Sequence, residues 1–300
     1  MKVVVTGGSG KIGLPAMKSL QKAGHEVTCF DCVPPKTGDF KYIQGNIKNR
    51  KDVDNALRGM DAVIHYAAYP YEGAGPTYSD TWDVNDTGTF NVFEFSVKNN
   101  IKKVVYASSI TATGVITWVT HHSIEYFPVD ELHPCRPQDL YGTGKLISEK
   151  LASMYAIRSN TSFIGLRFAC VWFGHPDFDE RTKMILDKYV RDPAKIFEVE
   201  KKEGPLVRDL VYEYVGEVDA VEASILALEK EGVKCDIYNI GAADSCSEWD
   251  SIKLAKFLYP EVPLRNPLAF VIDKKKPLFD ISKAQRELGY RPKFNWREFM

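Results

Sequence analysis

The sequence lacks a long hydrophobic run. The apolar stretch from Phe163 to Gly174 is too short to cross a bilayer, and Arg167 interrupts it. The N-terminus shows no apolar leader, because residues 2–5 already have the pattern of a first strand. We therefore expect a cytoplasmic protein without a membrane partner.

An excess of charge of either sign is also missing. The 39 basic and 40 acidic residues give a net charge of −1, so we expect no nucleic acid or anionic surface as partner. The 300 residues are 44% hydrophobic and 26% charged. These values are typical of an ordinary globular chain with one large or two modest domains.

Cysteine and histidine are too sparse and too scattered for a disulfide framework or a metal site. The six cysteines have no framework spacing, and we expect them to be reduced. Cys29 and Cys32 form a close pair, but they straddle Asp31 and no second pair completes a zinc site. His121 and His122 are adjacent and lack a third ligand, so we predict no metal.

The most informative feature present is a glycine-rich turn near the N-terminus. Val3–Val5 predicts a short buried strand, and the apolar spacing of residues 12–20 predicts a helix. Gly8-x-Gly10-x-x-Gly13 lies between them, in the pattern that places a pyrophosphate at a helix N-terminus. We assign five residues of this turn to a dinucleotide: Gly7, Gly10, Lys11, Ile12 and Gly13.

An acidic residue follows at the expected distance. The predicted second strand, residues 26–30, leads into Asp31, eighteen residues after Gly13. A carboxylate there can accept both adenosine ribose hydroxyls and repel a 2′-phosphate. No arginine follows in the next turn, and Lys36 is the nearest cation. The pattern favours NAD over NADP.

Strands and helices alternate at short spacing along most of the chain. Further strands are predicted at 40–44, 61–66, 103–107, 162–168 and 236–240, and helices at 51–57, 81–99, 141–160 and 217–231. This alternation predicts an α/β fold with a doubly wound parallel sheet of the Rossmann type. We expect residues 1–168 to form the NAD-binding domain, with 207–242 returning to it. Residues 169–206 and 243–300 would form a smaller substrate-binding region.

A tyrosine and a lysine four residues apart carry the predicted chemistry. Tyr141 and Lys145 would share one helix face, and Ser109 follows the strand predicted at 103–107, which leads to the same sheet edge as the glycine turn. A nearby ammonium and a cationic nicotinamide ring would lower the tyrosine pKa from its usual value of about 10. Tyr141 could then exchange a proton with a substrate alcohol while hydride moves. Lys145 would hold the nicotinamide ribose and Ser109 the substrate oxygen. The alternative is a pair on a helix surface.

Ordered motifs along almost the whole chain carry a family resemblance. They are Thr6-Gly7-Gly8-x-Gly10-x-x-Gly13, Asp31, Gly45-Asn46-Ile47, Ile64-His65-Tyr66-Ala67-Ala68, Asn85-x-x-Gly88-Thr89-x-Asn91-Val92, Ser108-Ser109-x-Thr111, Tyr141-x-x-x-Lys145, Leu166-Arg167, Arg208-Asp209-Leu210-Val211-Tyr212, Tyr238-Asn239-Ile240-Gly241, Asp280-Ile281-Ser282-Lys283-Ala284 and Glu287-Leu288-Gly289-Tyr290. The chain resembles the extended short-chain dehydrogenases/reductases, in the NAD-dependent epimerase/dehydratase family that includes nucleotide-sugar 4-epimerases.

The resemblance implies roles for further residues. Ser109, Tyr141 and Lys145 take the catalytic positions of the family. Other positions would bind the cofactor, namely Asn46 and Ile47 beside adenine and, along the path to the nicotinamide, Tyr66, Ala67, Ala68, Asn85, Ser108 and Phe168. The substrate side would be formed by Thr111, Cys170 and Arg208. The resemblance also implies a homodimer formed through the helices that contain Asn91 and Lys145.

Two departures from the family pattern bear on the reaction. Cys170 stands where members that bind nucleotide sugars usually have an asparagine. Ala112 and Thr113 follow Thr111 in place of the acidic pair that 4,6-dehydratases use, which argues against a dehydratase. Three functions remain: a nucleotide-sugar epimerase, which we favour, a dehydrogenase of a free sugar, uronate or small hydroxy compound, and a non-catalytic NAD sensor.

Overall fold

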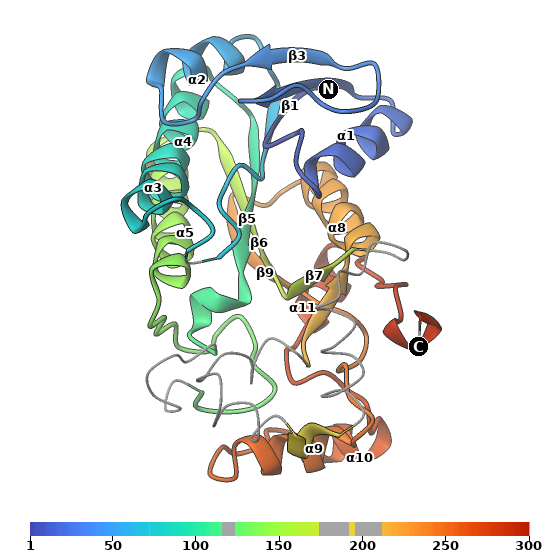
Figure 1. Ribbon diagram of the computed structural model, residues 1–300. Coiled ribbons are helices and arrows are strands. Elements are labelled where there is room, and N and C mark those ends of the chain that lie inside the picture. The colour runs from blue at the N-terminus through green and yellow to red at the C-terminus, as the bar shows by residue number, and fades with distance from the viewer. Residues whose placement is uncertain (72, 116–123, 174–191, 196–211, 300) are drawn as a thin grey trace.

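A seven-stranded parallel sheet organises the molecule (Figure 1). The computed structural model describes residues 1–71, 73–115, 124–173, 192–195 and 212–299. The strand order is β3-β2-β1-β4-β5-β6-β9. The strands are β1 (Lys2–Thr6), β2 (Glu26–Asp31), β3 (Lys41–Gln44), β4 (Ala62–His65), β5 (Lys103–Ser109), β6 (Ser162–Phe168) and β9 (Cys235–Ile240). The predicted α/β class with a doubly wound parallel sheet is confirmed.

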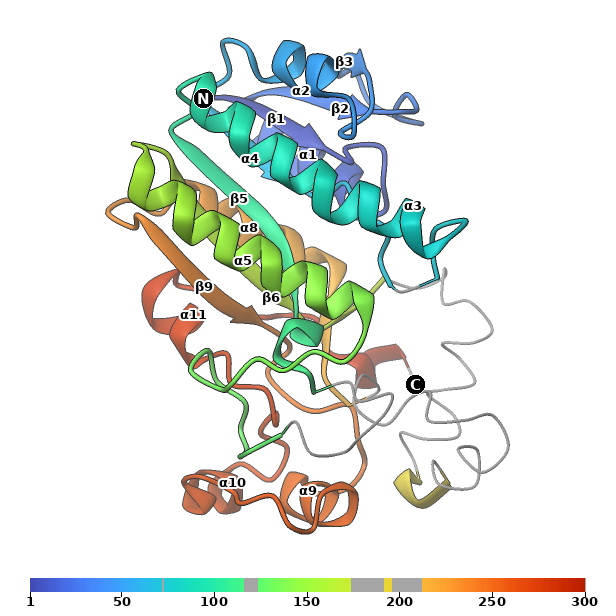
Figure 2. The same cartoon turned by 90° about the vertical axis from the view of Figure 1, so that its left-hand side faces the viewer.

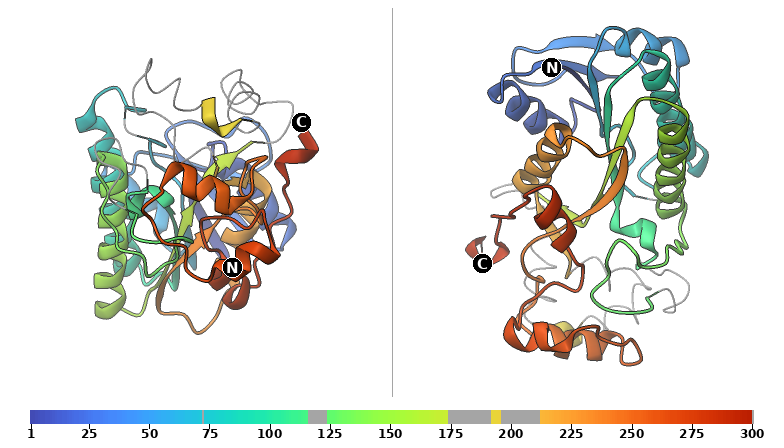
Figure 3. Two further views of the ribbon diagram at one scale, coloured as in Figure 1. Left: turned by 90° about the horizontal axis from the view of Figure 1, so that it is seen from below. Right: turned by 180° about the vertical axis from the view of Figure 1, so that it is seen from behind.

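Helices cover both faces of the sheet (Figures 1 and 3). One face holds α1 (Gly13–Lys22) and α8 (Glu217–Glu229), and the other holds α2 (Arg50–Leu57), α4 (Gly88–Lys98) and α5 (Leu140–Arg158). Alternate residues of β1 serve the two layers: Val5 packs in the cluster that includes Leu20 of α1, and Val4 in the one that includes Phe93 of α4. The central strands β1, β4, β5 and β6 are therefore buried on both faces, as expected for a parallel sheet, while the edge strand β3 is partly exposed.

The helix predicted at 81–99 is divided into three parts. It consists of α3 (Tyr78–Trp82), a π-helical segment η1 (Asp83–Thr87) and α4. Single π turns inside α-helices often lie at functional sites. In this segment two consecutive side chains, Asn85 and Asp86, are both buried. The extra residue of the π turn places both on the inner side, which the sequence pattern did not show.

The remaining elements lie beyond the carboxyl ends of the sheet strands or beside them. The short 3-10 segment η2 (Ile110–Thr113) follows β5, and β7 (Cys170–Trp172) pairs in parallel with β8 (Tyr214–Gly216). The other elements are η4 (Pro193–Lys195), α9 (Ser251–Leu258), α10 (Pro267–Ile272), α11 (Ser282–Glu287) and η5 (Trp296–Phe299). The charged helix expected near 181–191 lies outside the described residues. None of the helices in the described part of the chain has the length and apolar character needed to cross a membrane.

Candidate active site

The site lies where the order of the strands reverses. From β1 the chain runs outward to β2 and β3, and then returns to β4 on the other side of β1. Ligands of such sheets bind in the crevice at the carboxyl ends of the strands beside this reversal. Gly7 follows β1 there, and Ala67 follows β4. The two segments touch, because a Cβ at Gly7 would lie 2.7 Å from the Ala67 nitrogen.

Two glycines of the turn have no room for a side chain. Gly7 has a φ of +70°, and a Cβ on Gly13 would lie 2.1 Å from the Gly7 carbonyl oxygen. Glycine is therefore required for the turn and for the close packing of α1. Ile12 is the N-cap of α1 and supplies no side-chain hydrogen bond. Ile12 therefore leaves the first N–H groups of the helix without a side-chain cap, as expected for a helix N-terminus that binds a phosphate.

The side chain of Asp31 is fixed at the mouth of this turn. Its Oδ2 accepts a hydrogen bond from the Ser9 backbone N–H at 3.0 Å, and its Oδ1 accepts one from the Val33 N–H at 3.2 Å. The Ser9 hydroxyl donates to the Val33 carbonyl oxygen at 2.6 Å. These bonds hold the carboxylate beside the glycine turn, in the place where the sequence predicts that it meets the adenosine ribose.

The residues predicted beside adenine have different surroundings. The side-chain oxygen of Asn46 accepts a hydrogen bond from the Lys48 backbone N–H, and the Asn46 backbone N–H donates to the Asp52 carboxylate. Ile47 is buried in the core cluster that contains Phe30 and packs closely against Gly88. Ile47 therefore shapes this end of the crevice from within the core.

A buried chain of hydrogen bonds connects the glycine turn with the loop after β4. The Thr6 hydroxyl lies 2.6 Å from His65 Nδ1, and His65 Nε2 lies 2.9 Å from the Thr89 hydroxyl. The Asn85 amide bonds both the N–H and the carbonyl of Tyr69. Burial lowers the pKa of His65 to about 3, so the ring is neutral and joins the two threonines as a hydrogen-bonding bridge.

Several side chains predicted along the cofactor path are used within the protein. The Tyr66 hydroxyl donates to the Ser224 hydroxyl of α8 at 2.5 Å, and Asn85 holds Tyr69. The Ser108 hydroxyl donates to Glu149 Oε1 at 2.6 Å. Because the side chains of these three residues bond other parts of the protein, mainly their backbone atoms remain to contact a nucleotide. Lys11 lies over the ring of Phe173, with Nζ 5.0 Å from the ring centroid.

The structure brings Ser109, Tyr141 and Lys145 together at the carboxyl end of β5. The Ser109 hydroxyl accepts from the Thr111 N–H at 3.2 Å, and it lies close enough to the Tyr141 phenol to lower the pKa of that group. Lys145 Nζ donates to the Ala107 carbonyl at 2.8 Å and lies 5.4 Å from the Tyr141 ring centroid. The alternative of an exposed helix pair is wrong, because Lys145 is only 7% exposed.

The protein's own groups raise the pKa of Tyr141. Burial raises it to about 12; the hydrogen bond with Ser109 opposes this rise, and the nearby Asp139 and Cys170 add to it. Burial lowers the pKa of Lys145 to about 8, and the negative charge of Asp86 opposes that shift. The protein alone thus keeps Tyr141 as a neutral phenol, which can donate a proton. An added positive charge beside it would be needed to make it a base.

The structure describes two of the three residues predicted on the substrate side, Thr111 and Cys170. Thr111 Oγ1 is buried without a hydrogen-bond partner among the described residues, so it is a candidate for a substrate contact. Cys170 lies close enough to Tyr141 to influence its titration. Phe168 ends β6 opposite Ser109 and is buried. Arg208 lies outside the described residues.

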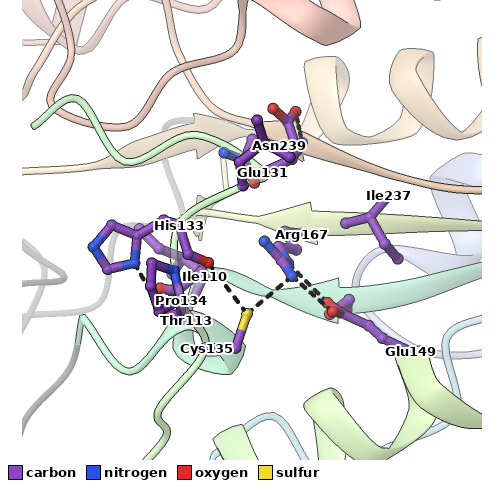
Figure 4. Close-up of polar contacts among 12 residues, drawn as sticks. Ile110, Thr113, Glu131, His133, Pro134, Cys135, Glu149, Arg167, Ile237 and Asn239 are labelled. Atoms are coloured by element: carbon purple, nitrogen blue, oxygen red, sulfur yellow. Dashed lines mark hydrogen bonds and ion pairs between the residues drawn. The ribbon is translucent and has the colours of Figure 1, made fainter. Parts of the chain in front are cut away.

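A buried ion pair supports the catalytic strand from behind (Figure 4). Arg167 of β6 donates from Nε to Glu149 Oε1 at 2.8 Å and from Nη2 to Oε2 at 2.7 Å. The same Nη2 lies 3.2 Å from Cys135 Sγ. With the Ser108 bond to Glu149, this pair joins β5, β6 and α5. Sequence reasoning missed Glu149, although it lies four residues after Lys145 on the same helix face.

These features define a class of protein. A doubly wound sheet, a glycine turn before a helix without a side-chain cap, an acidic residue at the end of β2 and a Ser-Tyr-Lys set with a buried serine and lysine are typical of enzymes that use NAD for hydride transfer. The model of the NAD dependent epimerase/dehydratase family matches residues 3–241. The chain belongs to this family. NAD is accordingly its cofactor.

Relatives and solved structures agree with this assignment. The UDP-glucose 4-epimerase of Lactobacillus helveticus is 28% identical over 98% of this chain and 92% of its own length. A short-chain dehydrogenase/reductase superfamily protein from Agrobacterium tumefaciens, solved with bound NAD, superposes with a TM-score of 0.73 at 19% identity, over 99% of this chain and 94% of that one. The UDP-glucose 4-epimerase of Thermotoga maritima, solved with UDP-glucose, gives 0.69 at 22%, over 99% and 96%.

Proposed function

We propose that the protein is a nucleotide-sugar epimerase that uses NAD. The observation that carries the proposal is the closeness of the half-buried Tyr141 to the buried Ser109, beside Lys145 and at the same sheet edge as the glycine turn. The full-length similarity to UDP-glucose 4-epimerases supports a UDP-sugar as substrate. The proposal also assigns Gly7, Gly10, Gly13 and Asp31 to NAD.

In this proposal, side chains of the protein transfer the proton. Tyr141 accepts the proton of the sugar hydroxyl as the sugar loses hydride, and Ser109 keeps a hydrogen bond to the same oxygen. Lys145 supplies positive charge near the phenol and binds the nicotinamide ribose. NAD, when bound, accepts the hydride and returns it. Between the two transfers the keto sugar turns over in the site, so that hydride returns to its other face and Tyr141 returns the proton.

A specific observation keeps a dehydrogenase as the second candidate. Cys170 lies close to Tyr141, at the position where we expected an asparagine if the chain binds a sugar diphosphate. A thiol is a weak hydrogen-bond donor compared with an amide. A free sugar, uronate or hydroxy compound needs no diphosphate contact there, and its oxidation would release NADH.

One assay distinguishes the two candidates. The purified protein is given NAD with UDP-, GDP- and dTDP-sugars and with free sugars, uronates and hydroxy acids. NADH absorbance is followed over time, and the products are separated by chromatography. We expect a sugar nucleotide to be converted to its epimer without accumulation of NADH. Steady NADH formation from a free compound would instead establish the dehydrogenase.

We also propose a homodimer that forms through the layer of α3, α4 and α5. These helices lie side by side on one face of the molecule (Figure 2). Large apolar side chains are exposed on this layer, among them Tyr78 and Ile157. Light scattering after size exclusion would test it, and Ile157→Glu should shift the mass toward that of a monomer. All six cysteines lie in the described part of the chain and none forms a disulfide there, which agrees with the cytoplasmic location that we propose. Cell fractionation would test that location.

A further inference from the structure

A buried carboxylate beside the site has no role in the mechanism so far. Asp86 lies in the π-helical segment η1 and is 6% exposed. Its Oδ1 accepts no hydrogen bond within the described part of the chain. Burying a carboxylate without a partner is costly, so a position of this kind calls for a compensating positive charge.

The carboxylate lies directly against the residue that precedes Lys145. A Cβ placed on Gly144 would lie 2.7 Å from each of the two Asp86 carboxylate oxygens. Any larger residue at position 144 would therefore displace the carboxylate. The absence of a side chain at Gly144 lets Asp86 approach the first turns of α5, where Tyr141 and Lys145 are located.

The two charges act on each other. Burial raises the pKa of Asp86 to about 6, and Lys145 opposes this rise. Burial lowers the pKa of Lys145 to about 8, and Asp86 opposes that fall. Between these values both groups are charged. The hydrogen bond that Lys145 donates goes to a neutral acceptor, the Ala107 carbonyl. Among the described residues, Asp86 is the negative charge that raises the pKa of Lys145.

Other titratable groups around the pair are neutral or engaged elsewhere. His65 of β4 is neutral, since its pKa is lowered to about 3. The acids of the neighbouring helices have partners of their own, which are Thr77 for Asp80 of α3, Arg50 and Lys98 for Glu94 of α4, and Arg167 for Glu149 of α5. Asp139, the N-cap of α5, accepts from the Gly142 N–H. Asp83 of η1 does not influence the titration of Lys145.

We propose that Asp86 is the counter-charge of Lys145, a positioning residue that keeps the lysine protonated at neutral pH and so maintains an ammonium beside Tyr141. The ammonium of Lys145, together with the positive charge of NAD when bound, would favour the phenolate form of Tyr141. The inference rests on the proposed function for its catalytic consequence. The coupling of the two charges does not depend on the substrate.

The test measures Lys145 itself. Protein is prepared with isotope-labelled lysine, and the Lys145 side-chain signal, assigned with Lys145→Arg, is followed by NMR against pH. In Asp86→Asn the side chain keeps its shape and loses its charge, and we expect the titration midpoint of Lys145 to fall by about one pH unit. Asp83→Asn, in the same π turn, is the matched control and should leave the midpoint unchanged.

A second readout is the pH profile of turnover. The loss of activity at alkaline pH should move to lower pH in Asp86→Asn by the same amount and stay in place in Asp83→Asn. An unchanged Lys145 midpoint in Asp86→Asn overturns the inference. If Asp86→Asn does not fold, Gly144→Ala replaces it, because the new Cβ displaces the carboxylate and should also lower the midpoint. If the wild-type protein converts no sugar nucleotide, the proposed function fails, and the NMR titration still decides the role of Asp86.

Discussion

The Ser108 hydroxyl donates a hydrogen bond to Glu149 Oε1, which also accepts from Arg167 Nε. The residue before the proposed catalytic serine is thereby joined to the helix that contains Lys145. Arg167 and Glu149 are 4% and 7% exposed at their side chains. The end of β5 that carries Ser109 is therefore joined to α5 and β6 through a buried ion pair.

Breaking this pair should destabilise the protein strongly. Arg167→Met leaves the Glu149 carboxylate buried and uncompensated, which we expect to cost about 3–5 kcal/mol of unfolding free energy. Denaturant unfolding measures it. The matched control is Arg58→Met, which breaks the exposed pair with Asp54 and should cost no more than about 1 kcal/mol. Equal losses in the two variants would contradict the structural role of the buried pair.

Removing the phenol hydroxyl should stop catalysis and spare the cofactor site. In Tyr141→Phe the proton acceptor is lost, so we expect turnover to fall by about 100- to 10,000-fold. NAD affinity, measured by calorimetric titration, should change little. Tyr155→Phe, near the C-terminal end of the same helix, is the control and should retain turnover. Wild-type rates in Tyr141→Phe would show that another group moves the proton.

Asp31 should determine the preference between NAD and NADP. Asp31→Ala removes the carboxylate that the proposal places on the ribose hydroxyls, along with its bonds to the Ser9 and Val33 N–H groups. Losing hydrogen bonds to a charged group should lower the ratio of NAD to NADP affinity by about 10- to 100-fold. Asp39→Ala, on the exposed loop that follows β2, is the control. A ratio that stays the same in Asp31→Ala would show that the discrimination lies elsewhere.

Glu213 should make the protein less stable as the pH rises. Burial raises the pKa of Glu213 from its usual 4.5 to about 8, although Ser245 and the Leu278 N–H donate to it. Between these two values the folded state binds more protons than the unfolded state, so the free energy of unfolding falls with rising pH. Thermal unfolding of wild type and Glu213→Gln from about pH 5 to pH 8 tests this.

The variant carries no titrating carboxyl at this position, so its stability should depend less on pH than that of the wild type. Glu26→Gln, at the exposed start of β2, provides the control and should follow the wild type. Parallel pH curves for wild type and Glu213→Gln would mean that Glu213 titrates at an ordinary pKa in the folded protein.

The sequence predicted the sheet and the meeting of Ser109 with Tyr141 and Lys145. Buried strands have continuous apolar runs, and a spacing of four residues defines one helix face. The rise of the Tyr141 pKa that the protein's own groups cause could not be predicted, because desolvation depends on how far the folded chain covers the phenol. The partners of Tyr66, Asn85 and Ser108 were also hidden. Tyr66 bonds a residue of α8 more than a hundred positions away.

The π turn Asp83–Thr87 sets the rotational phase between α3 and α4. An α-helix advances by about 100° per residue, so the one extra residue of a π turn rotates everything on one side of it by that angle. Deleting a single residue here would restore a regular helix and turn Asn85 and Asp86 away from Tyr69 and Gly144. An insertion or deletion in this turn should therefore disturb the site more than a substitution of one of its exposed residues.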